Sequence, residues 1–455
     1  MNIIRKFLGF ISGGESGRSD EERDPIVVSR ENHIISRKSI DADALKVLNR
    51  LNRFKHTAYL VGGGVRDLLL EGPVKDFDIA TSAHPHEVKK LFRNSRLIGR
   101  RFRLVHILFR ERKVIEVSTF RSHAGFSDEA DLLIKSDNTF GSSEEDARRR
   151  DFTVNGLFYN IADFSIIDYV GGLKDLESKV IATIGDPDIR FREDPIRMLR
   201  AIRFAARLDF DLAPSTRQTL ERHRKEIWKG AVPRILDELL KMLRQGSALK
   251  SFRLMNDLKI LEILLPRFAR DYGKAELREQ IERSLEAIDG LTKPKADPSP
   301  ALLGAVLYSP SFHALMSSDN APTDRLKAAA ELLAEDLAKL NFPKMQSERA
   351  RQILAAQHRI ENIGKRKIRP SHLVRKGYFD DALTLFELSR PPSKENRSII
   401  RRWQALKKST GQPEGDEKST REDRPTGRRP GSRRRRRSSR GTGRRPDSAQ
   451  AGEAS

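Results

Sequence analysis

The sequence contains no cysteine, and it contains no long hydrophobic run. The first absence excludes a disulfide framework, an iron–sulfur or thiolate zinc site and a cysteine nucleophile, and it fits a reducing compartment. The second excludes a membrane protein, because no apolar run approaches the roughly 20 residues that span a bilayer. The apolar start of the chain is interrupted at Arg5 and Lys6 and is too short for a signal-peptide core. We therefore predict a cytoplasmic protein without a transmembrane segment.

Acidic residues are in deficit, since 64 Asp+Glu stand against 87 Lys+Arg, for a net charge of +23. This excess favours a polyanionic partner, with nucleic acid ahead of membrane lipid. Residues 411–455 hold 13 Lys+Arg and 7 Asp+Glu, which leaves +17 on residues 1–410. The last segment has almost no large apolar residue, so we predict that it is disordered. It includes an unbroken basic run of Arg433, Arg434, Arg435, Arg436 and Arg437, a candidate RNA-binding segment whose alternative role is a nonspecific polybasic extension.

The order of periodic patterns predicts an α+β head followed by a long α-helical remainder. A helix is expected over residues 41–54 and again over 65–70, and strands are expected over 58–61, 77–81, 104–109 and 114–120. Later amphipathic helices are expected at 196–208, 233–244, 252–265 and 324–340. The predicted domains are a poorly ordered polar leader (1–38), a head (39–180), a helical neck (181–245), a helical body (246–410) and the basic tail (411–455).

The strongest local motif is a glycine-rich turn followed by an Asp-x-Asp strand. Gly62 and Gly63 follow a short apolar strand, where glycine lets the backbone approach a triphosphate, and Arg66 follows closely. A tight turn without a ligand is the plain alternative. Asp76 and Asp78 sit at alternate positions, so both carboxylates point to one face. A shared divalent cation such as Mg²⁺ relieves their repulsion.

A two-metal phosphoryl-transfer site usually has a third acid, and the sequence offers two candidates. Glu116 lies in the strand 114–120, where its alternative role is to face solvent. Asp151 lies in a charged cluster with Arg149, Arg150 and Asn155, and it could instead orient an arginine and read a ribose hydroxyl. Taken alone, that cluster is typical of a solvated face or a helix cap.

A further cluster, Phe191 to Arg200, opens the first long helix. Asp194 stands three residues before Arg197, and Arg200 follows at the same spacing. An acceptor and a forked donor held together can read the edge of a nucleobase. The alternative is an ordinary ion pair across one helical turn, which stabilises by roughly a few tenths of a kcal/mol.

In this order, the motifs resemble the class II nucleotidyltransferases of the DNA polymerase β superfamily, which include tRNA CCA-adding enzymes and bacterial poly(A) polymerases. The stretch Asp168–Asp175 also matches that family, and the resemblance runs from about Ser36 to beyond Leu243. The segments Leu97–His106 and Asp137–Asp146, together with the arginine-rich tail, resemble the polymerase branch.

The resemblance implies a nucleotidyltransferase head with a mixed or antiparallel sheet, and a template-independent transfer of AMP from ATP to RNA 3′ ends. It implies that Asp76 and Asp78 hold two Mg²⁺ ions and that Asp151 completes the active site. Gly63 and Arg66 would contact the triphosphate and Arg150 the sugar side. Asp194, Arg197 and Arg200 would bind base and phosphates, so that the neck completes the nucleotide site.

The expected partners are the 3′ ends of mRNA and small RNAs, whose tailing promotes turnover, together with RNA-decay proteins. One alternative is a CCA- or A-adding tRNA nucleotidyltransferase, because both activities use the same metal site. A second is a noncatalytic RNA-binding protein, against which the two aligned carboxylates argue. Assigning the body to RNA binding is an analogy at the level of the fold, and the sequence leaves the oligomeric state open.

Overall fold

The computed structural model describes residues 24–74, 76–99, 104–122, 140–291, 297–365 and 369–410. The chain divides into two units, residues 1–410 and residues 411–455. The predicted basic tail and its arginine run therefore lie outside the described residues. Within the described ranges, no helix combines the length and apolar character needed to cross a membrane.

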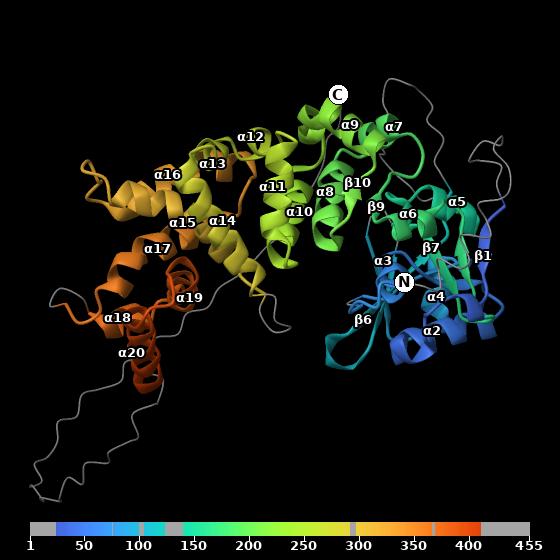
Figure 1. Cartoon of the computed structure of the whole chain (residues 1–455). Helices are drawn as coiled ribbons and strands as arrows, with labels where there is room; N and C mark the ends of the chain where they lie inside the picture. The colour runs from blue at the N-terminus through green and yellow to red at the C-terminus, as the bar shows by residue number, and fades with distance from the viewer. Residues whose placement is uncertain are drawn as a thin grey trace, which may run out of the picture. The chain divides into compact units, whose positions relative to one another are not determined.

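A mixed eight-stranded sheet forms the head (Figure 1). Its strand order is β1-β8-β7-β2-β3-β6-β5-β4, and only β3 and β6 pair in parallel. The predicted α+β class with a mixed sheet is confirmed. The strands are β1 (Ile26–Val28), β2 (Ala58–Val61), β3 (Asp78–Thr81), β4 (Ser95–Ile98), β5 (Leu104–Leu108), β6 (Val114–Thr119), β7 (Leu157–Asn160) and β8 (Ile166–Asp168).

The two faces of the sheet differ in what covers them. On one face Leu60, Ile79 and Val117 join the main hydrophobic core, against helices α2 (Ala42–Arg53) and α4 (Pro85–Leu91). The other face carries a small separate cluster, which consists of Val61, Ala80, Phe120, Ala147, Phe158 and Ile167. Because side chains alternate along a strand, Asp78 and Glu116 lie on this second face. The sheet thus separates its acids from the main core.

Helix α2 shows how local sequence positions the head. The Asp41 carboxylate accepts from the backbone N–H groups of Asp43 and Ala44, which is a standard start for a helix. The buried positions Ala44, Val47, Leu48 and Leu51 follow a helical period along one face. Other short helices of the head are α3 (Gly63–Leu69), α5 (Ser143–Arg148), α6 (Gly172–Ser178) and the 3₁₀ turns Arg37–Ser39, Arg110–Arg112 and Thr153–Asn155.

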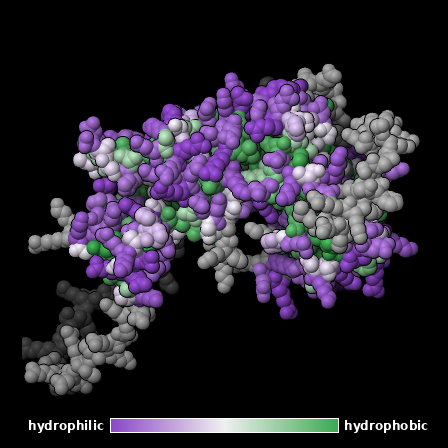
Figure 2. Space-filling model, viewed as in Figure 1, coloured by the Kyte–Doolittle hydropathy of each residue, from purple (hydrophilic) through white to green (hydrophobic). Residues whose placement is uncertain are grey.

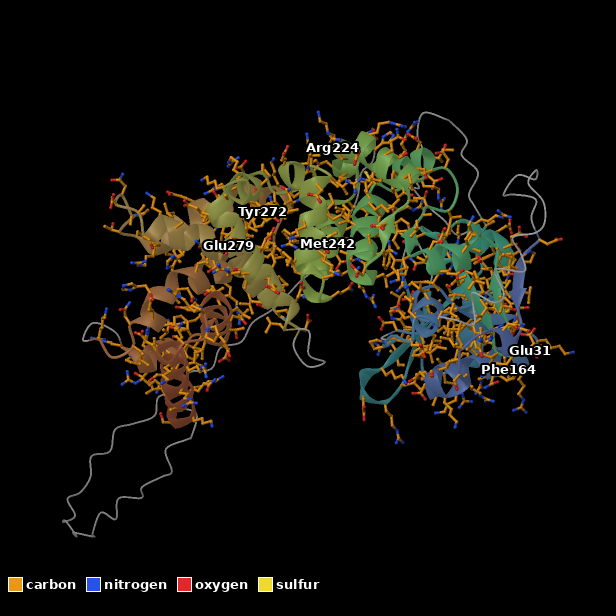
Figure 3. All side chains as sticks on the ribbon, in the orientation of Figure 1. Glu31, Phe164, Arg224, Met242, Tyr272 and Glu279 are labelled. Atoms are coloured by element: carbon orange, nitrogen blue, oxygen red, sulfur yellow. The ribbon has the colours of Figure 1, made fainter. Side chains whose placement is uncertain are left out.

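The prediction of a poorly ordered leader through residue 38 is wrong for residues 24–38. β1 pairs with β8 in antiparallel register, and Ile35 is only 1% exposed. The Nε2 atom of His33 lies 2.7 Å from the carbonyl oxygen of Phe164. Glu31 belongs to the 3₁₀ turn Arg30–Asn32, and Figure 3 shows its label beside that of Phe164. A strand of three residues has too few positions to show a periodic pattern, so only its pairing reveals it.

The neck and body are helical, and Figure 2 shows hydrophilic residues over most of the visible face. The neck contains the parallel strand pair β9 (Val180–Ile181) and β10 (Asp211–Leu212) with α7 (Pro187–Glu193), α8 (Ile196–Leu208), α9 (Pro214–His223), the 3₁₀ helix Arg224–Lys229 and α10 (Val232–Arg244). The body contains α11 (Ala248–Asp257), α12 (Leu261–Leu264), α13 (Pro266–Tyr272), α14 (Ala275–Asp289), α15 (Pro300–Met316), α16 (Arg325–Lys339), α17 (Lys344–Glu361), α18 (Pro370–Val374), α19 (Phe379–Ser389) and α20 (Lys394–Thr410).

The predicted helices at 196–208, 233–244 and 324–340 coincide with α8, α10 and α16. The prediction of one helix over 252–265 is wrong, because the chain turns between α11 and α12. Lys259 adopts a left-handed conformation with a φ of +56°, and the N–H of Ile260 donates back to the carbonyl of Met255. Such a residue ends a helix by satisfying its last carbonyls from the reversed chain.

Candidate active site

One row of polar side chains crosses three strands on the second face of the sheet. Asp78 at the start of β3 lies opposite Glu116 of the parallel strand β6. Glu116 in turn lies opposite His106 of β5, and 3.2 Å separates His106 Nε2 from Glu116 Oε2. Asp76 precedes β3 by two residues and, like Asp78, is exposed. The β3–β6 pairing therefore places Glu116 directly beside Asp78, and Asp76 lies near enough to repel the Asp78 carboxylate.

The electrostatics of Asp78 reflect these neighbours. Although the residue is exposed, desolvation by the surrounding protein is the largest cause that raises its pKa. Repulsion from Glu116 and Asp76 raises the pKa further, and attraction to Arg150 lowers it. The net effect moves the pKa of Asp78 from 3.8 to about 6. Positive charge placed between these carboxylates would relieve the repulsion.

Asp76, Asp78 and Glu116 fit a divalent cation in donor chemistry, since Mg²⁺ prefers carboxylate oxygens. Their strand positions also fit, because Asp78 and Glu116 are direct neighbours across the β3–β6 pair. Among the described residues, no three His, Asp or Glu side chains lie close enough together to form a complete metal-binding group. The site thus offers the ligands of a metal centre without a preformed cage.

The glycine-rich turn lies next to Arg150. Gly62 has a φ of +72°, a conformation that L side chains rarely adopt. A Cβ atom at Gly62 would lie 3.0 Å from Arg150 Nη1, and one at Gly63 would lie 3.3 Å from Arg66 Nη2. The absence of side chains in this turn therefore leaves the space that two guanidinium groups occupy.

Arg66 points into the protein and is 1% exposed. Its Nε and Nη2 atoms donate to Asp67 Oδ1 over 2.9 and 2.7 Å, and its Nη1 atom donates to Asn155 Oδ1. Arg207 of α8 donates to the other oxygen of Asp67 over 3.1 Å. Burial lowers the pKa of Arg66, and the charge of Asp67 opposes that shift. Arg66 and the buried Asn155 therefore support the glycine turn from the protein interior. Direct contact of either side chain with a nucleotide stays a prediction.

Arg149 and Arg150 share a buried partner that sequence reasoning did not single out. Arg149 Nη2 lies 2.6 Å from Asp146 Oδ1 and Arg150 Nη2 lies 2.8 Å from Asp146 Oδ2. Burial opposes ionisation of Asp146, but attraction to Arg150 and Arg149 holds its pKa below the usual range. The guanidinium of Arg150 also lies over the Phe158 ring, 5.2 Å from its centroid. The spacing of three and four residues on a helix was the available signal for these pairs.

The carboxylate of Asp151 is bound by an arginine and an asparagine. Its Oδ2 atom accepts from Nε and Nη2 of Arg200 over 2.7 and 2.6 Å, and its Oδ1 atom accepts from Asn155 over 3.1 Å. Burial opposes its ionisation, but attraction to Arg200 and the bond from Asn155 hold the pKa of Asp151 well below its ordinary range. A carboxylate already matched by a guanidinium lacks the excess negative charge that attracts a metal. Of the two candidates for the third acid, the geometry thus favours Glu116.

The predicted pair of Asp194 with Arg197 is not formed in the structure, and this corrects the expectation that the two are held together. Asp194 instead binds both Nη atoms of Arg234 on α10, over 2.9 and 2.8 Å. Arg197 donates to Glu193 over 2.7 Å. The reason is local, because Asp194 ends α7 with extended backbone and α8 begins only at Ile196.

Glu193 and Arg190 form a buried lock between neck and head that sequence reasoning missed. Glu193 Oε2 accepts from Arg190 over 2.8 Å and from Arg197 over 2.7 Å. The other arm of Arg190 donates to the carbonyl oxygens of Arg149 and Arg150 over 2.7 and 2.5 Å. Burial, followed by repulsion from Arg197, lowers the pKa of Arg190 to about 10. The lock fixes the backbone that carries the two arginines of the site.

Phe204 of α8 is a second feature that sequence reasoning did not find. Three guanidinium groups lie over its ring, with distances to the centroid of 5.3 Å for Arg66, 5.3 Å for Arg200 and 4.3 Å for Arg203. Such contacts typically stabilise by about 0.5–2 kcal/mol each. No local pattern connects residues 66 and 204, so only the fold shows that this ring joins neck and head.

Three family models match the chain in succession. Residues 58–182 match the "Poly A polymerase head domain", residues 209–272 the "Probable RNA and SrmB- binding site of polymerase A", and residues 319–441 the "Polymerase A arginine-rich C-terminus". The first match contains the acids, the glycine turn and the arginine cluster described above.

Curated relatives include poly(A) polymerase I of Salmonella typhi, which is 44% identical over 62% of this chain and 63% of its own length. Poly(A) polymerase I of Haemophilus influenzae is 40% identical over 64% of this chain and 67% of its own length. The chain thus spans a little under two thirds of the first of these relatives. A CCA-adding enzyme of Lactobacillus johnsonii is 40% identical over 48% of this chain and 54% of its own length.

Among solved structures, the Bacillus stearothermophilus CCA-adding enzyme in complex with CTP is similar, with a TM-score of 0.59 and 28% identity over 80% of this chain and 82% of that one. A Thermotoga maritima CCA-adding enzyme complexed with tRNA shares the fold at 21% identity and a TM-score of 0.55. It aligns with 84% of this chain and 86% of its own. The three matched models and the poly(A) polymerase I of Haemophilus influenzae, of which the chain covers two thirds, show that the chain belongs to the poly(A) polymerase family of nucleotidyltransferases.

Proposed function

We propose that this chain is a template-independent polynucleotide adenylyltransferase, which transfers AMP from ATP to the 3′ end of RNA in the cytoplasm. The acid row beside the glycine turn supports nucleotidyl transfer. The choice of polymerase over tRNA end repair depends on one observation, that the polymerase models continue beyond the head through residues 319–441. The 40% identical CCA-adding relative favours CCA or A addition to tRNA as the second candidate.

The proposed site holds Mg²⁺ on Asp76, Asp78 and Glu116. When bound, the metal supplies the positive charge that stabilises the reacting phosphate oxygens and the departing pyrophosphate. The RNA 3′ hydroxyl loses its proton to solvent and its oxygen attacks the α-phosphate, so that a new phosphodiester bond forms as the bond to pyrophosphate breaks. This transfer requires no side-chain nucleophile, which agrees with the absence of cysteine.

The chain's own residues position the nucleotide in this proposal. The side chain-free turn at Gly62 and Gly63 lets the triphosphate approach the backbone, and Arg150 lies beside the turn. Arg149 and Arg150 add charge to this part of the site, and their shared pairing with Asp146 fixes both groups. Asp151 holds Arg200 in place, while Asp194 and Arg197 stay predictions as base-binding groups.

A primer-extension assay tests the proposal. A generic 5′-labelled RNA and a tRNA that lacks its CCA end are incubated with Mg²⁺ and with ATP alone, CTP alone, or both. Long A-tails on the generic RNA from ATP alone are the expected result. Addition of one to three nucleotides to the tRNA only would assign the chain to tRNA end repair. No addition to either RNA would leave a noncatalytic RNA-binding protein.

Substitution of Gly62 by alanine is expected to raise the KM for ATP about tenfold or more. The new methyl group would meet Arg150 Nη1 at 3.0 Å and force it to shift, and small displacements at a site have large kinetic costs. The matched control is Gly171→Ala, because Gly171 has a similar φ of +77° but nothing within 4 Å of its Cβ position. Equal KM values in the two variants would contradict the role of Arg150 beside the turn.

Deletion of residues 411–455 is expected to weaken RNA binding and to flatten its salt dependence, with little change in the single-turnover rate at saturating RNA. The deleted segment carries 13 of the 87 Lys+Arg residues, and each lost phosphate contact lowers the slope of log affinity against log salt by roughly 0.7 on single strands. Fluorescence anisotropy at several salt concentrations measures that slope. An unchanged slope would show that the tail makes no contact with RNA.

A further inference from the structure

The helical body contains a pocket of about 620 Å³, apart from the acids of the head. It is formed by α14, α15, α17 and α19 and by the start of α16, and it falls in the size range of about 300–1,000 Å³ that ligand sites occupy. Figure 3 marks α14 by the label on Glu279. The lining combines three arginines and two histidines with an apolar wall, namely Arg283, Arg325, Arg390, His313, His358 and Phe312.

Among the described residues, the charges in this pocket leave one cation, Arg325, without an acidic partner. Arg283 pairs with Glu279, and Arg390 pairs with Glu361 over 3.1 Å. Half-buried Arg325 makes no ion pair with any of the described residues. A guanidinium with five donors and no matching carboxylate is a ready partner for a phosphate group.

The remaining lining suits a nucleobase. Phe312 is 5% exposed and, with Pro310 and Met316, forms an apolar wall. Burial, followed by repulsion from Arg390 and Arg325 respectively, lowers the pKa values of His313 and His358. Both shifts favour the neutral imidazole, which offers one donor and one acceptor. Apolar surface and neutral polar groups beside a cation are the elements of single-strand recognition.

We propose that this pocket binds one nucleotide of the single-stranded RNA, with its phosphate on Arg325 and its base against Phe312. The identity of the RNA as substrate rests on the proposed function, while the pocket itself rests on its volume, its apolar wall and the uncompensated charge of Arg325. A nucleotide of an RNA strand and a free nucleotide present the same base and phosphate to this pocket. A free nucleotide is therefore the alternative ligand. The body would then hold an internal nucleotide of the RNA whose 3′ end is extended at the head.

The first test measures RNA affinity of the full chain with 5′-fluorescein-labelled oligo(A) of about 20 nucleotides at several salt concentrations. Arg325→Ala is expected to weaken binding about three- to tenfold and to lower the salt slope by roughly 0.7, the value of one phosphate contact on a single strand. Arg325→Lys should restore the slope, because it restores the charge. The matched control is Lys327→Ala, which removes a charge from the same helix at a 73% exposed side chain outside the pocket.

Equal affinities and slopes for Arg325→Ala and Lys327→Ala would overturn the proposal, even if the wild-type chain adds AMP. Conversely, a loss of affinity confined to Arg325→Ala supports the pocket even if no AMP is added to any RNA, in which case only the proposed activity fails. Folding of each variant is checked by its melting temperature. If Arg325→Ala melts early, the comparison is made with Arg325→Gln, which also removes the charge but keeps a long polar side chain.

The second test separates the two sources of nucleotide. The full chain is photo-crosslinked either to oligo(A) that contains 8-azidoadenosine or to free 8-azido-AMP, and the modified peptides are mapped by mass spectrometry. Crosslinks from the RNA to the α15 segment around Phe312 are expected. Crosslinks to that segment from the free nucleotide only, or from neither probe, would overturn the assignment to RNA.

Discussion

Replacement of Asp78 by asparagine is expected to lower the rate of AMP addition at least about a thousandfold while RNA affinity changes less than twofold. Asparagine keeps the shape of the side chain but removes one of the two charges that face each other across β3 and β6. The single-turnover rate with a labelled RNA primer and ATP measures the effect. Exposed Asp211, in the neck strand β10, supplies the matched control Asp211→Asn, which should retain the full rate.

The same variant is expected to be more stable than the wild type when no metal is present. The folded-state pKa of Asp78 is raised from 3.8 to about 6, so the folded chain binds this proton more tightly than the unfolded chain does. Raising the pH from about 4 to about 6 therefore removes stability from the wild type, and the loss persists above pH 6. The asparagine variant avoids this loss. Its advantage in melting temperature should be present at pH 7.5, absent at pH 4 and small, because Asp78 is exposed.

Magnesium should reverse the order of stability. A cation that binds only the folded state raises the melting temperature, and the wild type holds all three acids whereas the variant does not. Thermal melts at pH 7.5 with and without MgCl₂ test this without any assay of activity. A variant that retains turnover, or an equal Mg²⁺-dependent rise in both proteins, would disprove the metal-site assignment.

Replacement of Arg190 by alanine is expected to cost about 3–5 kcal/mol in the free energy of unfolding, the usual cost of breaking a buried ion pair from one side. Arg190 is 5% exposed and bonds both Glu193 and the backbone carbonyls of Arg149 and Arg150. Without Arg190, the carbonyl groups of Arg149 and Arg150 would lose its N–H donors. Glu193, which is 2% exposed, would keep Arg197 as its ion-pair partner but lose Arg190. Urea unfolding measures the change.

Arg192→Ala is the matched control for Arg190→Ala. Arg192 lies two residues along the same helix, but its side chain is 49% exposed and its ion pair with Asp188 is long, at 4.0 Å. Its removal should cost less than about 0.5 kcal/mol, as for most exposed side chains. Because the Arg190 lock fixes the backbone of the site's arginines, Arg190→Ala should also raise the KM for ATP, whereas Arg192→Ala should not. Equal unfolding free energies for the two variants would contradict the lock.

Much of the head was predictable because its signals are local. A helical period marks 42–53, and short apolar runs ended by glycine or alternating with polar residues mark β2, β3, β5 and β6. The spacing of Asp76 and Asp78 placed both carboxylates on one face, since alternate strand residues share a face. The ordered set of motifs carried the family resemblance, and the matched models bear that resemblance out.

The tertiary structure determined which residues of those motifs contact one another. Parallel pairing of β3 with β6 placed Glu116 beside Asp78, although 38 positions separate them in the sequence. Packing of α8 against the head paired Asp151 with Arg200, which compensates the charge that the Asp151 carboxylate would otherwise offer to a metal. Packing of α10 gave Asp194 the partner Arg234 in place of Arg197. Periodicity and spacing report on residues within one element, whereas these contacts depend on the register and packing of distant elements, which no local pattern contains.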